Sequence, residues 1–279
     1  MNTILVPVDF SATAINAAKY AVYFAKQCGV QKLVLYNAFE IPVLSDGGLT
    51  VPVVAGSNEI QKSSIERLEN LRKELINEFN VIFKIEIKSS FNTVVTGIKE
   101  AVKEVGADFI VMGITGGNSV EEVLIGSNSV DLAKNIDTPV LIVPPTVKFN
   151  YIRNVLLTTD LKNIIETTPA DAIEDIIHTT KAQLHLLNVD TNNQHESLED
   201  IDFESMEVST LFQHLNPEYH FTKNENFVDG VNKFIDFRGI DLVIAVPKKH
   251  SFIQSLFHKS HSNMLAFHSH VPVLMVHLD

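Results

Sequence analysis

The sequence predicts an α/β protein made of two tandem, doubly wound, five-stranded and mostly parallel sheets. Three observations support this prediction. Short apolar runs that suit strands alternate with amphipathic segments that suit helices, which is the order of βαβ units with right-handed crossovers. The chain has 279 residues, which exceeds the size of one common domain. The second half of the chain also repeats the pattern of the first half, so the same unit is expected twice.

The repeat has constant offsets. Identical residues recur 151 residues apart early in each half and 133 residues apart late in each half, in the pairs Asp9 and Asp160, Asn37 and Asn188, Asp108 and Asp241, and Pro139 and Pro272. The difference of 18 residues predicts a deletion in the second half, between its second and fourth strands. The stretch "PPTVKFNY" reads as a Pro-marked linker. We therefore predict one domain at residues 1–146 and a second domain at residues 151–279.

The first half opens with a strand and a helix. "TILVPV" is a short apolar run that suits a strand buried on both faces. Ser11 can cap the helix that follows, and Gly29 can end it. The helix is predicted by apolar residues at spacings of three and four, namely Ile15, Ala18, Val22 and Ala25.

The remaining elements of the first half continue the alternation. Residues 32–38 and 81–87 read as strands, and between them lie a loop at residues 41–56, rich in Gly, Pro and Ser, and a long helix. The apolar stripe of that helix consists of Ile65, Leu68, Leu71, Leu75 and Phe79. There follow a helix at 94–106 with Gly106 as its stop, a strand at 108–113, a helix at 119–135 and a strand at 139–144.

Composition and charge exclude several classes of function. The formal net charge of −12 argues against nucleic acid and anionic membrane surfaces as partners. No apolar run reaches the ~18 residues of a membrane helix, and the first residues lack the basic and apolar regions of an export signal. The single cysteine, Cys28, excludes an intramolecular disulfide. We therefore expect a cytoplasmic protein.

Glycine and small polar residues gather in "VMGITGGNSVEEVLIGSNSVDLA", at residues 111–133. Gly113 directly follows an apolar strand, and parallel sheets bind ligands at the carboxyl ends of their strands. Gly126 begins a segment that reads as a helix N-terminus, whose free N–H groups and dipole bind phosphate. The stretch is neither a Walker A loop nor a G-x-G-x-x-G motif. It predicts a phosphate site, and the alternative is a plain strand-to-helix turn with a helix cap.

The spacing of these glycines resembles a known signature. Gly113-x2-Gly116-x9-Gly126-Ser127 follows the G-x2-G-x9-G-[S/T] pattern of ATP-binding universal stress proteins. "ILVPVDFS", "DFIVMGITGG" and "NIDTPVLIVP" are also similar to that family, and the resemblance covers both halves. It implies a tandem universal stress protein with the fold of the adenine nucleotide alpha hydrolases.

The resemblance also implies a nucleotide site. Pro7, Val8 and Asp9 would line the adenosine side. Ala38 would meet adenine through its backbone. The residues at the ribose and phosphates would be Met112, Gly113, Gly116, Gly126, Ser127, Asn128 and Ser129. The cofactor would be ATP or a related adenine nucleotide, with Mg²⁺ held by phosphate and water oxygens.

The second half departs from the signature. By the constant offset, the residues at the positions of the three glycines and the serine are Val246, Lys249, Lys259 and Ser260. Valine and lysine place Cβ atoms where the backbone must approach the nucleotide closely. We therefore expect the second domain to be degenerate and not to bind ATP in the same manner.

The favoured function is a nucleotide-regulated binding or signalling module in the stress response. No catalytic constellation can be read, and the first half has no His to act as a general base, so at most slow hydrolysis is expected. The alternatives are a nucleotide-free interaction protein and an adenylating enzyme of a related fold. The apolar strands at residues 139–144 and 271–276 should not be left as open edges. Members of the family pair there, which implies an internal pseudo-dimer and allows a homodimer; the protein partner is not indicated.

All eleven histidines lie in the second half. Four of them gather near its end, at His258, His261, His268 and His270. Their spacing matches neither a zinc finger nor an H-E-x-x-H helix, so no metal site is predicted, and pH sensing is the alternative.

Overall fold

The computed structural model describes residues 1–40, 43–46, 49–52, 57–113, 132, 136–159, 164–191, 210–246 and 271–278. In the first half, the strands of the main sheet are β1 (Thr3–Pro7), β2 (Lys32–Phe39), β5 (Lys84–Phe91), β6 (Phe109–Gly113) and β7 (Val140–Val143). The helices there are α1 (Ala12–Cys28), α2 (Ser57–Phe79) and α3 (Val94–Val105). A separate hairpin pairs β3 (Val43–Asp46) with β4 (Leu49–Pro52).

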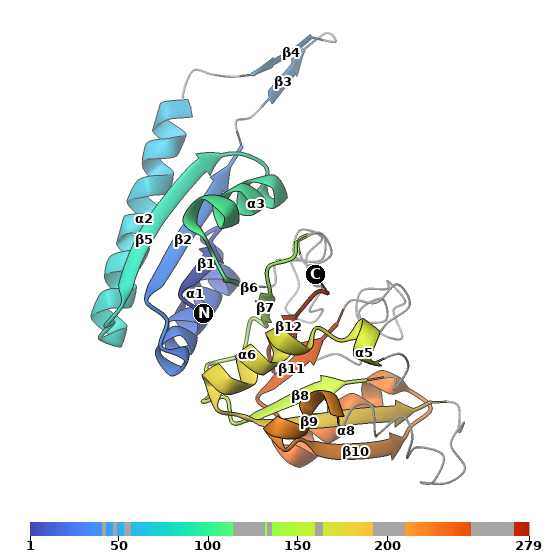
Figure 1. Ribbon diagram of the computed structural model, residues 1–279. Helices are drawn as coiled ribbons and strands as arrows, with labels where there is room; N and C mark the ends of the chain where they lie inside the picture. Colours follow the sequence, from blue (N-terminus) through green and yellow to red (C-terminus); the bar gives the residue numbers. More distant parts are fainter. Residues whose placement is uncertain are drawn as a thin grey trace.

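The second half repeats this arrangement. Its strands are β8 (Asn154–Thr158), β9 (Gln183–Asp190), β10 (Glu218–Lys223), β11 (Leu242–Ala245) and β12 (Val273–Met275). Its helices are α5 (Ile164–Thr167), α6 (Ala170–Thr180) and α8 (Phe227–Arg238), with a short 3-10 helix η2 (Gln213–Leu215). Figure 1 shows the two halves as successive α/β units that meet at β7 and β12.

The main sheet confirms the predicted fold class. In the described part of the chain its order is β10-β9-β8-β11-β12-β7-β6-β1-β2-β5. Each half therefore places its strands in the same doubly wound order, and neighbouring strands within each half run parallel. The antiparallel pair is β7 with β12, where the two halves join. The two five-stranded units thus form one continuous sheet, and the two apolar strands expected to need a cover lie against each other.

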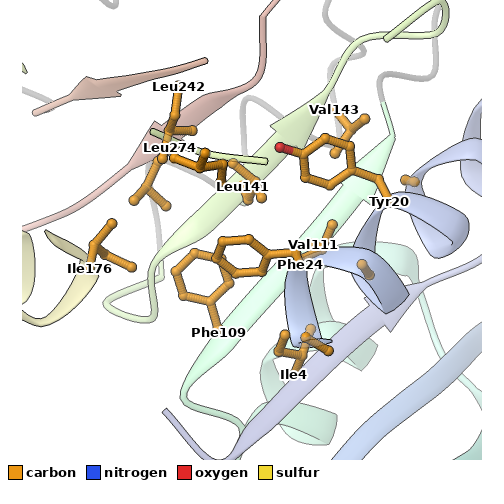
Figure 2. Close-up of a cluster of buried hydrophobic side chains, with 14 of the residues drawn as sticks. Ile4, Tyr20, Phe24, Phe109, Val111, Leu141, Val143, Ile176, Leu242 and Leu274 are labelled. Carbon is orange, nitrogen blue, oxygen red and sulfur yellow. The ribbon is translucent and has the colours of Figure 1, made fainter. Parts of the chain in front are cut away.

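The sheet is buried on both faces, as a parallel sheet requires. Because successive residues of a strand point to opposite faces, Ile4 and Val6 pack into the cluster that contains the buried faces of α1 and α2, whereas Leu5 packs into the cluster of α3. Figure 2 shows how the first cluster continues across the junction, with Leu141 of β7 beside Leu274 of β12. One apolar core therefore spans both halves.

The repeat seen in the sequence is also a repeat of hydrogen bonds. The Asp108 carboxylate accepts from the backbone N–H of Thr3 at 3.0 Å, and the Asp241 carboxylate accepts from the backbone N–H of Asn154 at 3.0 Å. Each aspartate precedes the fourth strand of its half and fixes the start of the first strand. The constant offsets therefore mark equivalent positions in the fold.

The two halves differ in their first helix. α1 is continuous from its N-cap at Ser11 to its C-cap at Gly29, as the sequence predicts. In the second half the same stretch is broken into α5 and α6, with Pro169 between them. Pro169 stands at the position equivalent to Ala18, which is buried in the middle of α1. Proline removes a backbone donor and clashes with the preceding turn, which explains the break.

Two other boundaries differ from the sequence-based expectation. The region at residues 41–56 was expected to be a loop, but it contains the hairpin of β3 and β4. Asp46 pairs with Leu49, so two residues connect the strands, and the Gly-Gly dipeptide at residues 47–48 is a hairpin signal that the composition of the region obscured. β5 begins at Lys84 rather than at residue 81. Of the helix expected at residues 119–135, the structure describes Leu132, which is helical and buried.

None of the helices in the described ranges has the length and the apolar character that crossing a membrane requires.

Cys28 is expected to react slowly with thiol reagents. It is the last residue of α1 and packs against the core, and burial raises the pKa of its thiol to about 12. The reactive species is the thiolate, so at pH 8 the folded protein should be alkylated about 100-fold or more slowly than the chain in guanidinium chloride. The measurement is the rate of iodoacetamide labelling followed by mass spectrometry. Equal rates in the folded and denatured protein would contradict the burial of this thiol.

Candidate functional site

The turn between β1 and α1 is fixed by an aspartate. Asp9 accepts hydrogen bonds at Oδ1 from the backbone N–H of Ser11 at 2.9 Å and from its hydroxyl at 2.6 Å. The Ser11 hydroxyl oxygen in turn accepts from the backbone N–H of Ala14 at 3.2 Å and so caps the helix. Phe10, between them, has a φ of 64°, which is unusual for an aromatic residue. Such strain at the carboxyl end of a strand is typical of functional turns.

A basic side chain lies beside this turn. The guanidinium carbon of Arg67, on α2, lies 3.9 Å from the centroid of the Phe10 ring, in cation–π contact. Both residues line a groove together with Asp9. Arg67 carries no signal in the sequence, because it belongs to the polar face of a long helix and nothing in its spacing sets it apart. The structure thus places one positive charge next to the turn of an acidic protein.

Six of the predicted residues line one cleft. They are Pro7, Val8, Asp9, Ala38, Met112 and Gly113. The cleft lies at the carboxyl ends of β1, β2 and β6, where the strand order reverses direction around β1. Its empty space is about 520 Å³ when the open solvent at its mouth is included. The structure therefore brings together residues that lie far apart in the sequence.

The walls of the cleft include residues that the sequence analysis missed. Val94 and Ile98 of α3 form an apolar side, and Tyr36 and Asn37 of β2 form part of the floor. The hydroxyl of Tyr36 lies 2.7 Å from that of Ser90, which holds the ring in place. Asn37 carried a signal in the sequence, since it recurs as Asn188, but it was not interpreted as a site residue.

Asn37 is the centre of a buried polar network. Its side-chain amide N–H donates to the carbonyl of Val8 at 2.6 Å, and its Oδ1 accepts from the hydroxyl of Ser64 at 2.7 Å. The Ser64 hydroxyl also lies 2.7 Å from that of Ser89. Asn37 and Ser64 are 8% and 5% exposed. The network therefore ties β1, β2, α2 and β5 together under the cleft.

The backbone of Ala38 is presented to the cleft. The N–H of Val8 donates to the carbonyl of Tyr36 at 2.7 Å, so the peptide groups of Tyr36 face β1. Peptide groups two residues apart on a strand face the same side, and those of Ala38 therefore point beyond the end of β1 at Pro7. The Val8 carbonyl is already bonded to Asn37. Ala38 can thus offer one donor and one acceptor to a planar ligand.

Gly113 is required by a close approach to α1. A Cβ atom at this position would lie 2.6 Å from the carbonyl oxygen of Thr13 and 3.2 Å from the backbone nitrogen of Ala14. Both are backbone atoms and cannot rotate away. The position that a Cβ atom of residue 113 would occupy therefore faces the first turn of α1. The close packing that glycine allows holds the β1–α1 turn against β6.

The second half keeps the frame of the site but not this glycine. Asn188 donates to the carbonyl of Thr159 at 3.0 Å, as Asn37 does to Val8. Val246 stands in the position of Gly113, and the helix that it would face is the broken one. The difference between the halves predicted from the sequence therefore coincides with a structural difference at the same edge.

Several predicted residues lie outside the described residues. In the first half these are Gly116, Gly126, Ser127, Asn128 and Ser129. In the second half they are Asp160, Lys249, Lys259, Ser260, His258, His261, His268 and His270.

Comparison with known proteins agrees with the fold. A family model for the Universal stress protein family matches residues 1–144. The universal stress protein MJ0577 of Methanocaldococcus jannaschii is 31% identical over 158 residues, which cover 50% of this chain and 93% of that protein. The crystal structure of a universal stress protein from Archaeoglobus fulgidus superposes with a TM-score of 0.71 at 18% identity, over 99% of this chain and 98% of that one. The chain belongs to the universal stress protein family.

Proposed function

We propose that the first half binds ATP or a related adenine nucleotide in the cleft at the ends of β1, β2 and β6. The observation that carries this proposal is the meeting of three separate segments, Pro7–Asp9, Ala38 and Met112–Gly113, in one cleft. The glycine signature begins at Gly113, where β6 ends beside that cleft. Residues selected for one ligand from three parts of the sequence thus share one place in the fold.

The adenine end of the ligand would lie between β2 and α3. The backbone N–H and C=O of Ala38 match the donor and acceptor edge of an adenine ring. Val94 and Ile98 offer the apolar surface that a flat ring requires. Recognition through backbone groups explains why the side chain at this position can be as small as alanine.

Asp9 would hold the ribose. Both bonds from Ser11 go to Oδ1, so Oδ2 is the oxygen that would accept from a ribose hydroxyl. A carboxylate repels phosphate, so the phosphates would extend away from Asp9 toward Gly113 and the signature that follows it. Backbone N–H groups and hydroxyl groups of that signature would bind them, with Mg²⁺ neutralising part of their charge.

The described lining of the cleft favours binding over turnover. Asp9 and Tyr36 are the ionisable side chains among the described lining residues, and Asp9 is engaged with Ser11. Burial raises the pKa of the Tyr36 hydroxyl, so this group stays protonated at neutral pH and does not supply a base. The activity that fits is nucleotide-regulated binding of a partner, with at most slow hydrolysis.

Titration calorimetry with ATP and Mg²⁺ tests this proposal. The wild-type chain is expected to bind about one ATP, and a Gly116→Val, Gly126→Lys variant is expected to bind none. The matched control is Lys249→Ala, Lys259→Ala at the equivalent positions of the second half, which should bind like the wild type. Absence of binding by the wild-type chain would contradict the proposal, as would loss of binding in the control alone. Release of AMP and pyrophosphate would instead favour an adenylating enzyme.

A further inference from the structure

Three side chains of types that can bind a metal ion meet on one face of the sheet, away from the cleft. His185 lies on β9, and Glu218 and His220 lie on the neighbouring strand β10. In the pairing register Glu218 is directly opposite His185. His220 is two residues further along β10, so all three side chains project from the same face.

The atoms that could bind a metal form a small triangle. Nδ1 of His185 lies 3.1 Å from Nε2 of His220, and each of these nitrogens lies 3.6 Å from Oε2 of Glu218. Ligands of a tetrahedral Zn²⁺ ion, at bond lengths of ~2.0–2.2 Å, lie about 3.3–3.6 Å from one another. The triangle therefore matches one face of a tetrahedral site without large movement of the side chains.

An asparagine orients the more buried histidine. Oδ1 of Asn154 lies 3.3 Å from Nε2 of His185, and a carbonyl oxygen can only accept, so the ring proton is on Nε2. The Asn154 amide N–H donates to the carbonyl of Gly239 at 3.2 Å, which fixes the direction of the amide. The lone pair of His185 Nδ1 therefore points at the other two side chains. This is the outer-shell arrangement that metal-binding histidines use.

The surroundings favour neutral histidines with access from one side. His185 is 4% exposed, and the Phe234 ring of α8 packs 4.7 Å from the His220 ring, centroid to centroid. Burial lowers the pKa of both histidines, so their nitrogens are available at neutral pH. Glu218 is exposed, so a metal ion could reach the three side chains from solvent on this side. Oε2 of Glu218 also lies 3.6 Å from Nη1 of Arg238. Arg238 is itself exposed and can turn outward when a cation takes its place.

We propose that His185, Glu218 and His220 form a binding site for a divalent transition-metal ion, with a water molecule as the fourth ligand. Two imidazole nitrogens and a carboxylate oxygen suit Zn²⁺ and its neighbours rather than Mg²⁺ or Ca²⁺. Binding moves the remaining proton of neutral His220 from Nε2 to Nδ1, so that Nε2 can face the metal. The site joins β9 to the edge strand β10 and would stabilise that edge.

A second group of similar composition serves as an internal comparison. Glu174 and His178 of α6 and His214 of η2 also lie close together, but both histidines of this group are exposed. Nε2 of His214 is 3.1 Å from Oε2 of Glu174, as in an ordinary surface ion pair. A metal bound there would be held on the surface and not on the sheet.

The test is metal binding by chain stripped with a chelator, using Zn²⁺ in equilibrium dialysis and Co²⁺ for its visible spectrum. Asn154→Ala removes an outer-shell partner and should weaken Zn²⁺ binding by roughly 10- to 100-fold. His220→Gln and Glu218→Gln each remove a ligand, and each should weaken Zn²⁺ binding by more than that. His214→Gln is the matched control and should keep both the affinity and the tetrahedral Co²⁺ spectrum. Circular dichroism checks that each variant is folded; the exposed Glu218 gives the variant with the least structural risk.

Two results would overturn the proposal. One is unchanged Zn²⁺ binding by both Glu218→Gln and His220→Gln. The other is loss of the tetrahedral Co²⁺ spectrum in His214→Gln with retention in His220→Gln, which would place the metal on the surface group. Neither result depends on nucleotide binding, because no nucleotide is present in the experiment.

Discussion

Replacement of Gly113 by valine is expected to abolish ATP binding and to lower the stability of the protein. A Cβ atom at this position would lie 2.6 Å from the Thr13 carbonyl oxygen, and the contact atoms belong to the backbone. Either the end of β6 or the first turn of α1 must therefore move. Overpacking of this kind costs roughly 1–3 kcal/mol in the free energy of unfolding. The displaced turn carries Asp9 and the Ser11 cap, so the cleft should lose its geometry as well.

The measurements are denaturant unfolding and ATP calorimetry on the same preparations. Gly29→Ala is the control, because Gly29 caps the other end of α1 with a φ of 67° and a Cβ atom there would meet nothing within 4 Å. That variant should lose about 1 kcal/mol from left-handed backbone strain and yet bind ATP normally. The pair separates a general loss of stability from a loss of the site. ATP binding by Gly113→Val at the affinity of the wild type would show that the β1–α1 turn does not shape the site.

The sequence allowed the order of the fold to be predicted because its signals are local or periodic. Apolar runs and stripes are visible within short segments of the chain. The repeat also identifies Asp108 and Asp241 as equivalent positions, and each makes the same hydrogen bond in its half. The six cleft residues could be selected because the resemblance to the universal stress protein family assigns them to the nucleotide site, which lies at the carboxyl edge of the sheet. Predictions of this kind depend on pattern and not on contacts.

What could not be predicted depends on contacts between distant segments. The triangle of His185, Glu218 and His220 exists only because β9 and β10 pair in one register, and a shift by one residue would put Glu218 and His220 on the other face. The contact of Arg67 with Phe10 likewise requires the position of α2 over the sheet. Neither the triangle nor the contact of Arg67 with Phe10 can be predicted from the spacing of residues along the chain.

A comparison of the two halves separates residues that the fold requires from residues that are candidates for ligand binding. The asparagine that bonds to the end of the first strand is present in both halves, as Asn37 and Asn188. The glycine that packs closely against α1, Gly113, is present in the first half alone. A feature shared by both halves is needed to build the sheet. A feature confined to the first half is the better candidate for nucleotide binding. Asn37 tests this distinction, because it has a counterpart in Asn188 and also lines the cleft.

Asn37→Ala and Asn188→Ala are expected to cost similar stability but to differ in ATP binding. Each asparagine is 8% exposed and bonds to the carbonyl of the residue that follows the first strand of its half. Loss of the amide removes this side-chain hydrogen bond, at about 1–3 kcal/mol. In the first half the carbonyl belongs to Val8, in the cleft wall, and Ser64 loses its acceptor as well. Asn37→Ala should therefore weaken ATP binding about tenfold or more, or about 1.4 kcal/mol.

Asn188→Ala should leave the ATP affinity unchanged, because its hydrogen bond to Thr159 lies in the half that lacks the glycine signature. Denaturant unfolding gives the stability of both variants, and calorimetry at a temperature where both are folded gives their affinities. Equal weakening by the two substitutions would mean that ATP binding follows the stability of the whole sheet, since the core is shared across β7 and β12. A loss limited to Asn37→Ala would instead show that the buried network under β1 and β2 sets the geometry of the cleft.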